Sequence, residues 1–322
     1  MRITRLLSFA FTTALISLQG TVHAKASDFP NQPVSIVVPT PAAGPLDLFS
    51  RLIGPKLAER WGQPVVVRNQ PGAGTALGTQ TVARAKPDGH TLLMANIAVS
   101  AHGALSKQPL FDLEKDLQPV SLIASTPFFL FVPGKGHTDL KSIVEDARKN
   151  PGDLNFAIIP NSQQHLDTVR VLNALGIEAT LIPYQGTAPI TVALLSNEVD
   201  AFLGSLGGMQ AYLDEGRLRA LASTGAEPSK HRPEIPTFRS LGFDIDMEPW
   251  YAIFAPAGLP ADRLQTLHES LLAVMADPEI VEKISAAGYD PKTSSPEALA
   301  KIASDNLALS KTIVRDAKIE AQ

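Results

Sequence analysis

Apolar residues alternate along this chain between short β-branched runs and longer stretches with helical spacing. The run Val34–Pro39 predicts a strand buried on both faces. Apolar residues then recur at helical spacing from Leu46 to Trp61, and Gly62 supplies a helix stop. Val65–Val67 predicts the next strand. Because a crossover helix joins the two strands, the pattern predicts that they are parallel.

The same alternation continues to residue 247. A helix over Thr75–Ala85 and a strand over Thr91–Ala95 complete a first β-α-β-α-β series. A second series runs from about residue 125 to 247. Two short apolar runs, Val120–Ala124 and Phe128–Val132, lie around Pro127 where it begins. Its predicted strands are Asn155–Ile159, Ala179–Ile182, Ala201–Leu203 and Leu218–Ala222, and its predicted helices are Leu140–Lys149, Gln163–Leu175, Pro189–Ser196 and Met209–Glu215.

The C-terminal part is mostly helical. After a strand over Trp250–Ala255, helices are predicted over Ala261–Met275, Pro278–Ala287 and Pro296–Ile319, with Pro, Ser or Asp at their starts. These helices have no partner sheet of their own. We therefore expect them to pack on the first α/β series.

The N-terminus has the features of a secretory signal. Arg2 and Arg5 precede an apolar run over Leu6–Leu18, and Val22-His23-Ala24 resembles a small-x-small cleavage site. The sequence thus predicts a cleaved signal over residues 1–24 and a periplasmic protein. An uncleaved membrane anchor is the alternative, although the run is short for a bilayer span.

Composition narrows the classes of partner. With 44% hydrophobic and 19% charged residues, the 322-residue chain is typical of soluble globular proteins. Loss of the two signal arginines changes the formal net charge from −4 to −6, which argues against nucleic acid as a partner. The absence of cysteine excludes disulfides, cysteine catalysis and thiolate metal sites.

Four loops share one design: each follows a predicted strand, is rich in Pro, Gly, Asn or Ser, and opens a helix. They are Pro39–Asp47, Asn69–Gly74, Pro160–Gln164 and Pro183–Thr187. Ligands of open α/β sheets bind at the carboxyl ends of strands. Helix starts carry free N–H groups and roughly half a unit of positive charge, so they suit an anion. The alternative is that these residues only make tight turns.

Signatures of enzymes and of metal sites are missing. The sequence has no Gly-x-Ser-x-Gly elbow, phosphate loop, dinucleotide fingerprint or His-Glu-x-x-His motif, and its seven histidines are scattered. We expect no catalytic residue, no cofactor and no metal. His165 and Tyr184 lie on or beside candidate loops and could face a ligand, or could serve only in local structure.

The loops and several longer segments resemble one family, the periplasmic receptors of tripartite tricarboxylate transporters, also called Bug-type proteins. The matching segments are VSIVVPTPAAGPLD, GQPVVVRNQPGAGTALGT, VARAKPDGHTLL, DLQPVSLI, IPYQGTAPITVALLSNEVDAF, GRLRALASTG, PEIPTF and WYAIFAPAGLP. The resemblance implies a two-domain hinged α/β fold of the Venus-flytrap type, each domain a mixed or mostly parallel sheet flanked by helices. It implies one domain of residues 25–124 plus 248–322 and another of residues 125–247.

The resemblance also implies a function. Such a receptor is a monomer that binds a small organic acid between its domains, through backbone amides, hydroxyls and water, and delivers it to a membrane permease. The implied ligand-binding residues are Thr40, Ala43, Gly44, Leu46, Asp47, Gly72, Ala73, Asn161, Ser162, Gln163, His165, Tyr184, Gly186 and Thr187.

Three departures from the family pattern bear on the ligand. Leu46 stands where a hydroxyl residue is usual, Gln185 replaces the basic residue after Pro-Tyr, and the loop from Ile159 to Gln164 is bulkier and carries amides. They predict a mono-acid or a polar neutral compound, aromatic ones included, over a tri-acid. Asp47 either caps its own helix or contacts a hydroxyl or ammonium group of the ligand.

Two other functions stay open at this point. A ligand-sensing partner of a membrane sensor kinase would use the same pocket. A periplasmic enzyme would need a nucleophile–base pair, which the sequence does not display.

Overall fold

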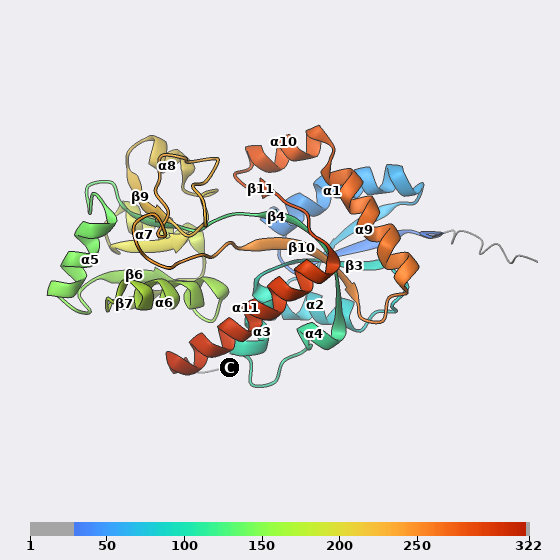
Figure 1. The fold of residues 1–322 in the computed structure, drawn as a ribbon, viewed down its shortest axis with the longest axis horizontal. Coiled ribbons are helices and arrows are strands. Elements are labelled where there is room, and N and C mark those ends of the chain that lie inside the picture. The colour runs from blue at the N-terminus through green and yellow to red at the C-terminus, as the bar shows by residue number, and fades with distance from the viewer. Residues whose placement is uncertain (1–28, 320–322) are drawn as a thin grey trace, which may run out of the picture.

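Two α/β lobes, each built on its own sheet, make up the part of the chain that the computed structural model describes, residues 29–319 (Figure 1). The sheet of the first lobe has six strands in the order β11-β4-β10-β3-β1-β2, and that of the second has five, in the order β7-β6-β8-β5-β9. The expected α/β fold is confirmed. The predicted secretory signal lies outside the described residues.

The first sheet is mixed. Its strands are β1 (Val34–Val38), β2 (Val65–Asn69), β3 (Thr91–Asn96), β4 (Leu117–Ser125), β10 (Trp250–Pro256) and β11 (Asp290–Pro291). β1 pairs in parallel with β2 and β3, as the crossover helices require. β10 runs antiparallel between β3 and β4. The predicted β-α-β-α-β series is therefore confirmed.

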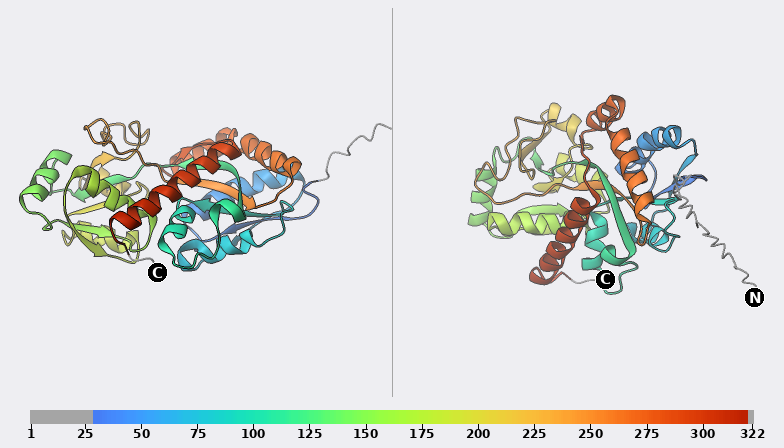
Figure 2. Two further views of the ribbon diagram at one scale, coloured as in Figure 1. Left: turned by 60° about the horizontal axis from the view of Figure 1, so that its bottom comes forward. Right: turned by 45° about the vertical axis from the view of Figure 1, so that its right-hand side comes forward.

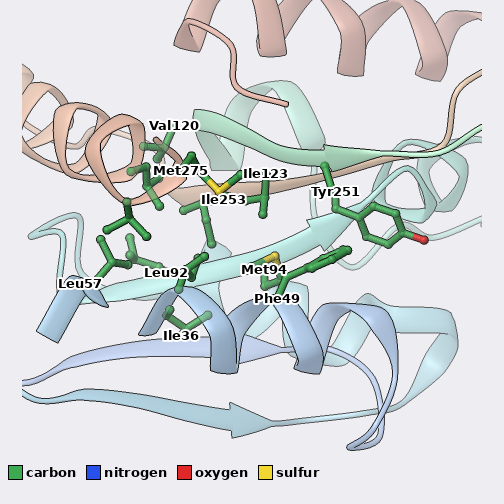
Figure 3. Close-up of a cluster of buried hydrophobic side chains, with 14 of the residues drawn as sticks. Ile36, Phe49, Leu57, Leu92, Met94, Val120, Ile123, Tyr251, Ile253 and Met275 are labelled. Atoms are coloured by element: carbon green, nitrogen blue, oxygen red, sulfur yellow. The ribbon is translucent and has the colours of Figure 1, made fainter. Parts of the chain in front are cut away.

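Helices cover both faces of this sheet. One face is covered by α1 (Pro45–Trp61), α9 (Ala261–Met275) and α10 (Pro278–Ala286). Every second residue of a strand points to this face, and the helices pack there on Ile36 of β1 and Met94 of β3. Figure 3 shows Phe49 of α1 beside Met94 in this cluster. Phe49 is fully buried, and burying a side chain of this size contributes about 1.5–3 kcal/mol.

The opposite face carries α2 (Ala76–Ala83), α3 (Ala98–Leu105), α4 (Leu113–Asp116) and α11 (Pro296–Asp316), with the 3-10 turn η1 (Ala73–Thr75) before α2. The C-terminal helices thus pack on the first lobe, as the sequence predicts.

The second lobe repeats the layered arrangement. Its strands are β5 (Phe129–Pro133), β6 (Asn155–Ile158), β7 (Thr180–Pro183), β8 (Ala201–Gly204) and β9 (Leu218–Ser223). Its helices are α5 (Leu140–Lys149), α6 (Gln163–Leu175), α7 (Thr187–Leu195) and α8 (Gln210–Asp214). β6 pairs in parallel with β7 and β8, so these three strands end at one edge.

The chain crosses between the lobes twice, from β4 to β5 and from β9 to β10. A third connection is α11, which runs from the first lobe toward α6 of the second (Figures 1 and 2). There Ile313 packs with Leu105 of α3 and Leu166 of α6. The division at residues 124 and 247 lies at or beside the crossings and stays a prediction.

The structure adds elements that the sequence pattern did not predict: α3, α4, β11 and η1. α3 has the sequence AVSAHGAL, in which small residues blur the helical spacing. Its packing explains them, because a Cβ on Gly103 would lie 3.0 Å from Leu307 Cδ1 of α11. The final helix is shorter than predicted and ends at Asp316 rather than Ile319. No helix within residues 29–319 is long and apolar enough to cross a membrane.

Candidate functional site

Loops from both lobes meet around one cavity of about 440 Å³, which we call the cleft cavity. Its lining residues are Ala73, Gly74, Ala98, Ala101, His102, Leu105 and Ser106 from the first lobe and Pro160, Asn161, Ser162 and Gln163 from the second. The structure therefore brings together four of the predicted residues, Ala73, Asn161, Ser162 and Gln163. The lining contains no Lys, Arg, Asp or Glu.

The second-lobe wall of the cleft cavity is the start of α6. Ser162 is its N-cap: its Oγ accepts from the His165 N–H at 3.3 Å and donates to the Ile159 carbonyl at 2.6 Å. Gln164 Oε1 accepts from the Ile159 N–H at 2.8 Å. These bonds fix the loop, in which Asn161 adopts a left-handed φ of 54°.

The first-lobe wall includes Ala98, the first residue of α3. One face of α3, from Ala98 to Ser106, therefore borders the cavity opposite the start of α6, and the Ala98 N–H already donates to Asn96 Oδ1 at 3.2 Å. The N–H groups in the first turn of a helix have no carbonyl partner within the helix, and they carry roughly half a unit of positive charge. This arrangement suits a carboxylate without any cationic side chain.

Burial disfavours the charged form of both histidines near the cleft cavity. His102 Nε2 accepts from the Leu110 N–H at 3.2 Å, and its ring stacks on Phe111 with centroids 5.0 Å apart. Burial lowers the pKa of His102 and likewise the pKa of His165. His165 Nδ1 is buried without a hydrogen-bond partner in the described part of the chain.

Asp47 holds the loop between β1 and α1. Its Oδ2 accepts from the Ala43 N–H at 3.0 Å and from Arg51 Nε at 2.9 Å, and its Oδ1 accepts from Asn69 Nδ2 at 3.0 Å. The hydrogen bond from Arg51 lowers the pKa of Asp47 to about 2, against the cost of burial. Both carboxylate oxygens are thus engaged within the protein. Asp47 does not cap its own helix, because the N-cap residue is Gly44, which has no side-chain cap, and the backbone N–H that Asp47 binds belongs to Ala43 before the helix.

Ala43, Gly44 and Asp47 line a second cavity of about 400 Å³, together with Arg51 and Tyr289. Tyr289 packs edge-on against Phe49 and Tyr251, with ring centroids 5.0 Å and 5.4 Å apart. Figure 3 shows Tyr251 at one end of the core cluster, with its hydroxyl oxygen pointing away from the aliphatic side chains.

Leu46 requires a correction. It is 1% exposed and packs in the core of the first lobe, because it lies on the inner face of α1. Its side chain is therefore not the apolar pocket wall that the sequence suggested, and only its backbone is left for a ligand contact.

Besides Leu46, six predicted residues line neither cavity: Thr40, Gly72, His165, Tyr184, Gly186 and Thr187. Thr40 Oγ1 is buried without a partner among residues 29–319. Gly72 has φ 138°, and a Cβ there would lie 2.6 Å from Leu77 Cδ1. The Tyr184 hydroxyl donates to Glu198 Oε1 at 3.2 Å, within its own lobe.

Sequence reasoning missed the contribution of α3 to the cleft cavity and the position of the loop after β8 between the lobes. A Cβ on Gly207 would lie 4.0 Å from Tyr289 Oη of the other lobe, and one on Gly208 would lie 4.0 Å from Thr187 Cγ2. The segment Gly204–Gly208 follows a strand and precedes a helix, so it has the same design as the four loops that were singled out. That signal could have identified it.

The described residues include no group of three or more His, Asp or Glu side chains placed to hold a metal ion. The polar groups of the cleft cavity are hydroxyls, amides and a neutral imidazole. They can bind and orient a ligand by hydrogen bonds.

Known proteins share this fold over nearly the whole chain. The family model for the tripartite tricarboxylate transporter family receptor matches residues 49–319. Protein BugT of Bordetella pertussis is 30% identical over 322 residues, which cover 98% of each chain. The solved periplasmic binding protein BugD is 29% identical with a TM-score of 0.76, covering 91% of this chain and 100% of its own. An R. palustris protein solved with adipate is 26% identical with a TM-score of 0.78, covering 91% of this chain and 99% of its own. The chain therefore belongs to the tripartite tricarboxylate transporter receptor family.

Proposed function

We propose that this chain is an extracytoplasmic solute receptor that binds a small organic acid between its lobes and delivers it to a membrane permease. It works in the periplasm, as a monomer, after removal of the predicted signal. The observation that carries the proposal is the start of α6, Ser162–Gln163, which borders one cavity opposite α3 of the other lobe.

Binding between lobes fits delivery to a partner. A ligand that contacts both walls stabilises the arrangement in which they are close, so occupancy changes the relative position of the lobes. A permease that recognises this arrangement then distinguishes loaded from empty receptor. The adipate in the R. palustris relative supports a carboxylate as the ligand class.

The cleft cavity favours a ligand with few negative charges. Its lining has no Lys or Arg, so each further carboxylate would lose its hydration without gaining a cationic partner. The hydroxyl of Ser162 and the amides of Asn161 and Gln163 suit a polar neutral group instead. We therefore propose a mono-acid or a polar neutral compound, which includes aromatic ones, ahead of a tri-acid.

Calorimetric titration of the purified mature chain tests the binding step. A panel of matched acids would contain benzoate, hexanoate, adipate and citrate. We expect a mono-acid to bind with micromolar affinity, equivalent to about 8 kcal/mol, and citrate to bind at least tenfold more weakly. If citrate were the tightest ligand, the proposed ligand class would be wrong. Uptake of the labelled ligand by cells with and without the gene tests delivery.

A further inference from the structure

A third cavity, of about 230 Å³, lies where the chain crosses between the lobes, and we call it the hinge cavity. Its walls come from the crossing segments at Ser125 and Met247–Trp250, from α6 and from α11. Gln163 lines both this cavity and the cleft cavity, so the two share a wall.

Asp167 is the unusual residue of the hinge cavity. It lies one turn after Gln163 on α6 and is 3% exposed. Its Oδ1 accepts from Gln163 Nε2 at 2.9 Å. Within the described residues, its Oδ2 has no partner, and neither does Gln163 Oε1. Two buried acceptors on neighbouring side chains thus lack a donor, which is costly and rare in folded proteins.

The other charges of the hinge cavity do not supply this donor. Asp246 pairs with Arg239 at 3.1 Å, and Glu248 pairs with Lys292 at 3.0 Å. Arg170 also lines the cavity, but it forms no ion pair with Asp167 within 4.0 Å. Burial raises the pKa of Asp167 to about 7. Asp167 is therefore the acid in this cavity that a cationic donor would stabilise most.

We propose that the hinge cavity binds a primary ammonium group, which donates to Asp167 Oδ2 and Gln163 Oε1. An ammonium supplies three N–H donors on one atom and a positive charge, so it satisfies both acceptors and neutralises the carboxylate. Ca²⁺ or Mg²⁺ fits less well, because each requires about six or more oxygen ligands. The ammonium group comes either from a free amine or from a ligand whose acid end lies in the cleft cavity.

Titration of the mature chain with methylammonium chloride tests the site, against potassium chloride at equal ionic strength and pH 8. We expect saturable methylammonium binding that Asp167→Asn weakens at least about tenfold. Asp246→Asn is the matched control, since it removes a paired acid from the same cavity and should leave binding within about twofold. Equal binding by Asp167→Asn, equal binding of potassium, or no binding would each overturn the proposal.

A second arm distinguishes the two sources of the group. ε-Aminocaproate carries an ammonium at the end of a six-carbon acid, and hexanoate is the same acid without it. If the ammonium belongs to the cleft ligand, Asp167→Asn should weaken ε-aminocaproate at least about tenfold and leave hexanoate unchanged. If it belongs to a free amine, methylammonium alone should depend on Asp167. Failure of both acids to bind would count against the proposed function and leave the methylammonium result standing.

Discussion

Asp47 and Arg51, one turn apart on α1, form a two-point ion pair: Arg51 Nε lies 2.9 Å from Asp47 Oδ2, and Arg51 Nη2 lies 2.9 Å from Asp47 Oδ1. The Asp47 side chain is 6% exposed and that of Arg51 is 55% exposed. The same carboxylate holds the backbone of Ala43 and the side chain of Asn69. An acid beside a predicted anion site is thus explained by its role in fixing two loops.

Asp47→Asn should destabilise the protein by about 2 kcal/mol, because an amide cannot accept from all these donors and presents N–H groups to some of them. Arg51→Ala should cost about 1 kcal/mol or less, since Arg51 is largely exposed. In the double variant the two losses should not add, because both remove the same pair. Urea unfolding of the four proteins measures this.

The pH dependence of the Asp47 variant has a defined sign. The folded pKa of Asp47, about 2, is below its ordinary value of 3.8. Its stabilisation is therefore present above pH 4 and is lost as the pH falls toward 2. The difference in the free energy of unfolding between wild type and Asp47→Asn should shrink in that window.

Ligand affinity tests the alternative role of Asp47. If Asp47→Asn lost ligand affinity more than about a hundredfold while Arg51→Ala bound as wild type does, Asp47 would be a ligand contact.

Gly78→Ala should disturb the cleft loops. A Cβ on Gly78 of α2 would lie 2.7 Å from the Gln70 carbonyl oxygen and 2.8 Å from Pro39 Cβ, and both residues belong to predicted binding loops. We expect a loss of about 1–3 kcal/mol in the free energy of unfolding and weaker acid binding. Thermal unfolding and calorimetry measure the two effects.

Gly54→Ala is the matched control, because Gly54 also lies inside a helix and its Cβ would lie 3.5 Å from Val65 Cγ1, an ordinary contact. It should stabilise the protein by up to about 1 kcal/mol through helix propensity. Equal effects of the two substitutions would mean that the close approach of α2 to the loops does not matter.

Ser162→Ala should weaken both the fold and the binding of the acid. Ser162 caps α6 at the cleft cavity, and loss of such a cap costs about 1 kcal/mol. Ser295 caps α11 by accepting from the Ala298 N–H at 3.2 Å and lines no part of the cleft cavity. Ser295→Ala should therefore cost a similar stability with no loss of affinity. If both variants bound the acid as wild type does, the start of α6 would not be part of the site.

Much of the fold could be predicted because strand and helix patterns here are local. α5, α6 and α9 have the predicted bounds, since Asp139, Ser162 and Pro260 precede periodic apolar residues and Asn150 and Gly176 follow two of these helices. α3 could not be predicted, because its small residues are explained by the close approach of α11, more than 190 residues later in the sequence.

The candidate site was predictable only in part for the same reason. Loop chemistry predicted Asn161–Gln163 at the cleft, because the cap and the turn are encoded within a few residues. The position of Leu46 in the core depends on which face of α1 meets the sheet, and a resemblance in one loop does not determine that. The walls of the hinge cavity come from α6, α11 and both crossing segments together. No local sequence pattern therefore predicts this cavity.

Asp167→Asn should stabilise the protein, and more so at high pH. The folded pKa of Asp167 is raised by burial to about 7, whereas its ordinary value is 3.8. Between these two values the unfolded chain releases a proton that the folded chain keeps, so the wild type loses stability as the pH rises through this window. Above pH 7 the full cost of ionising Asp167 in the folded protein is present. It is roughly 4 kcal/mol, at about 1.4 kcal/mol per unit of pKa difference.

Asparagine keeps an acceptor for Gln163 Nε2 and carries no charge, so the variant should escape this loss. We compare the free energy of unfolding of Asp167→Asn with that of wild type at each pH. The advantage of the variant should be roughly 2–3 kcal/mol larger at pH 8 than at pH 5. Urea unfolding in amine-free buffer at the two pH values measures the difference. Asp246→Asn, whose acid is ion-paired and more exposed, should show no such change. A flat difference between Asp167→Asn and wild type across this range would mean that Asp167 is ionised in the folded protein at pH 5, with a donor that the described residues do not provide.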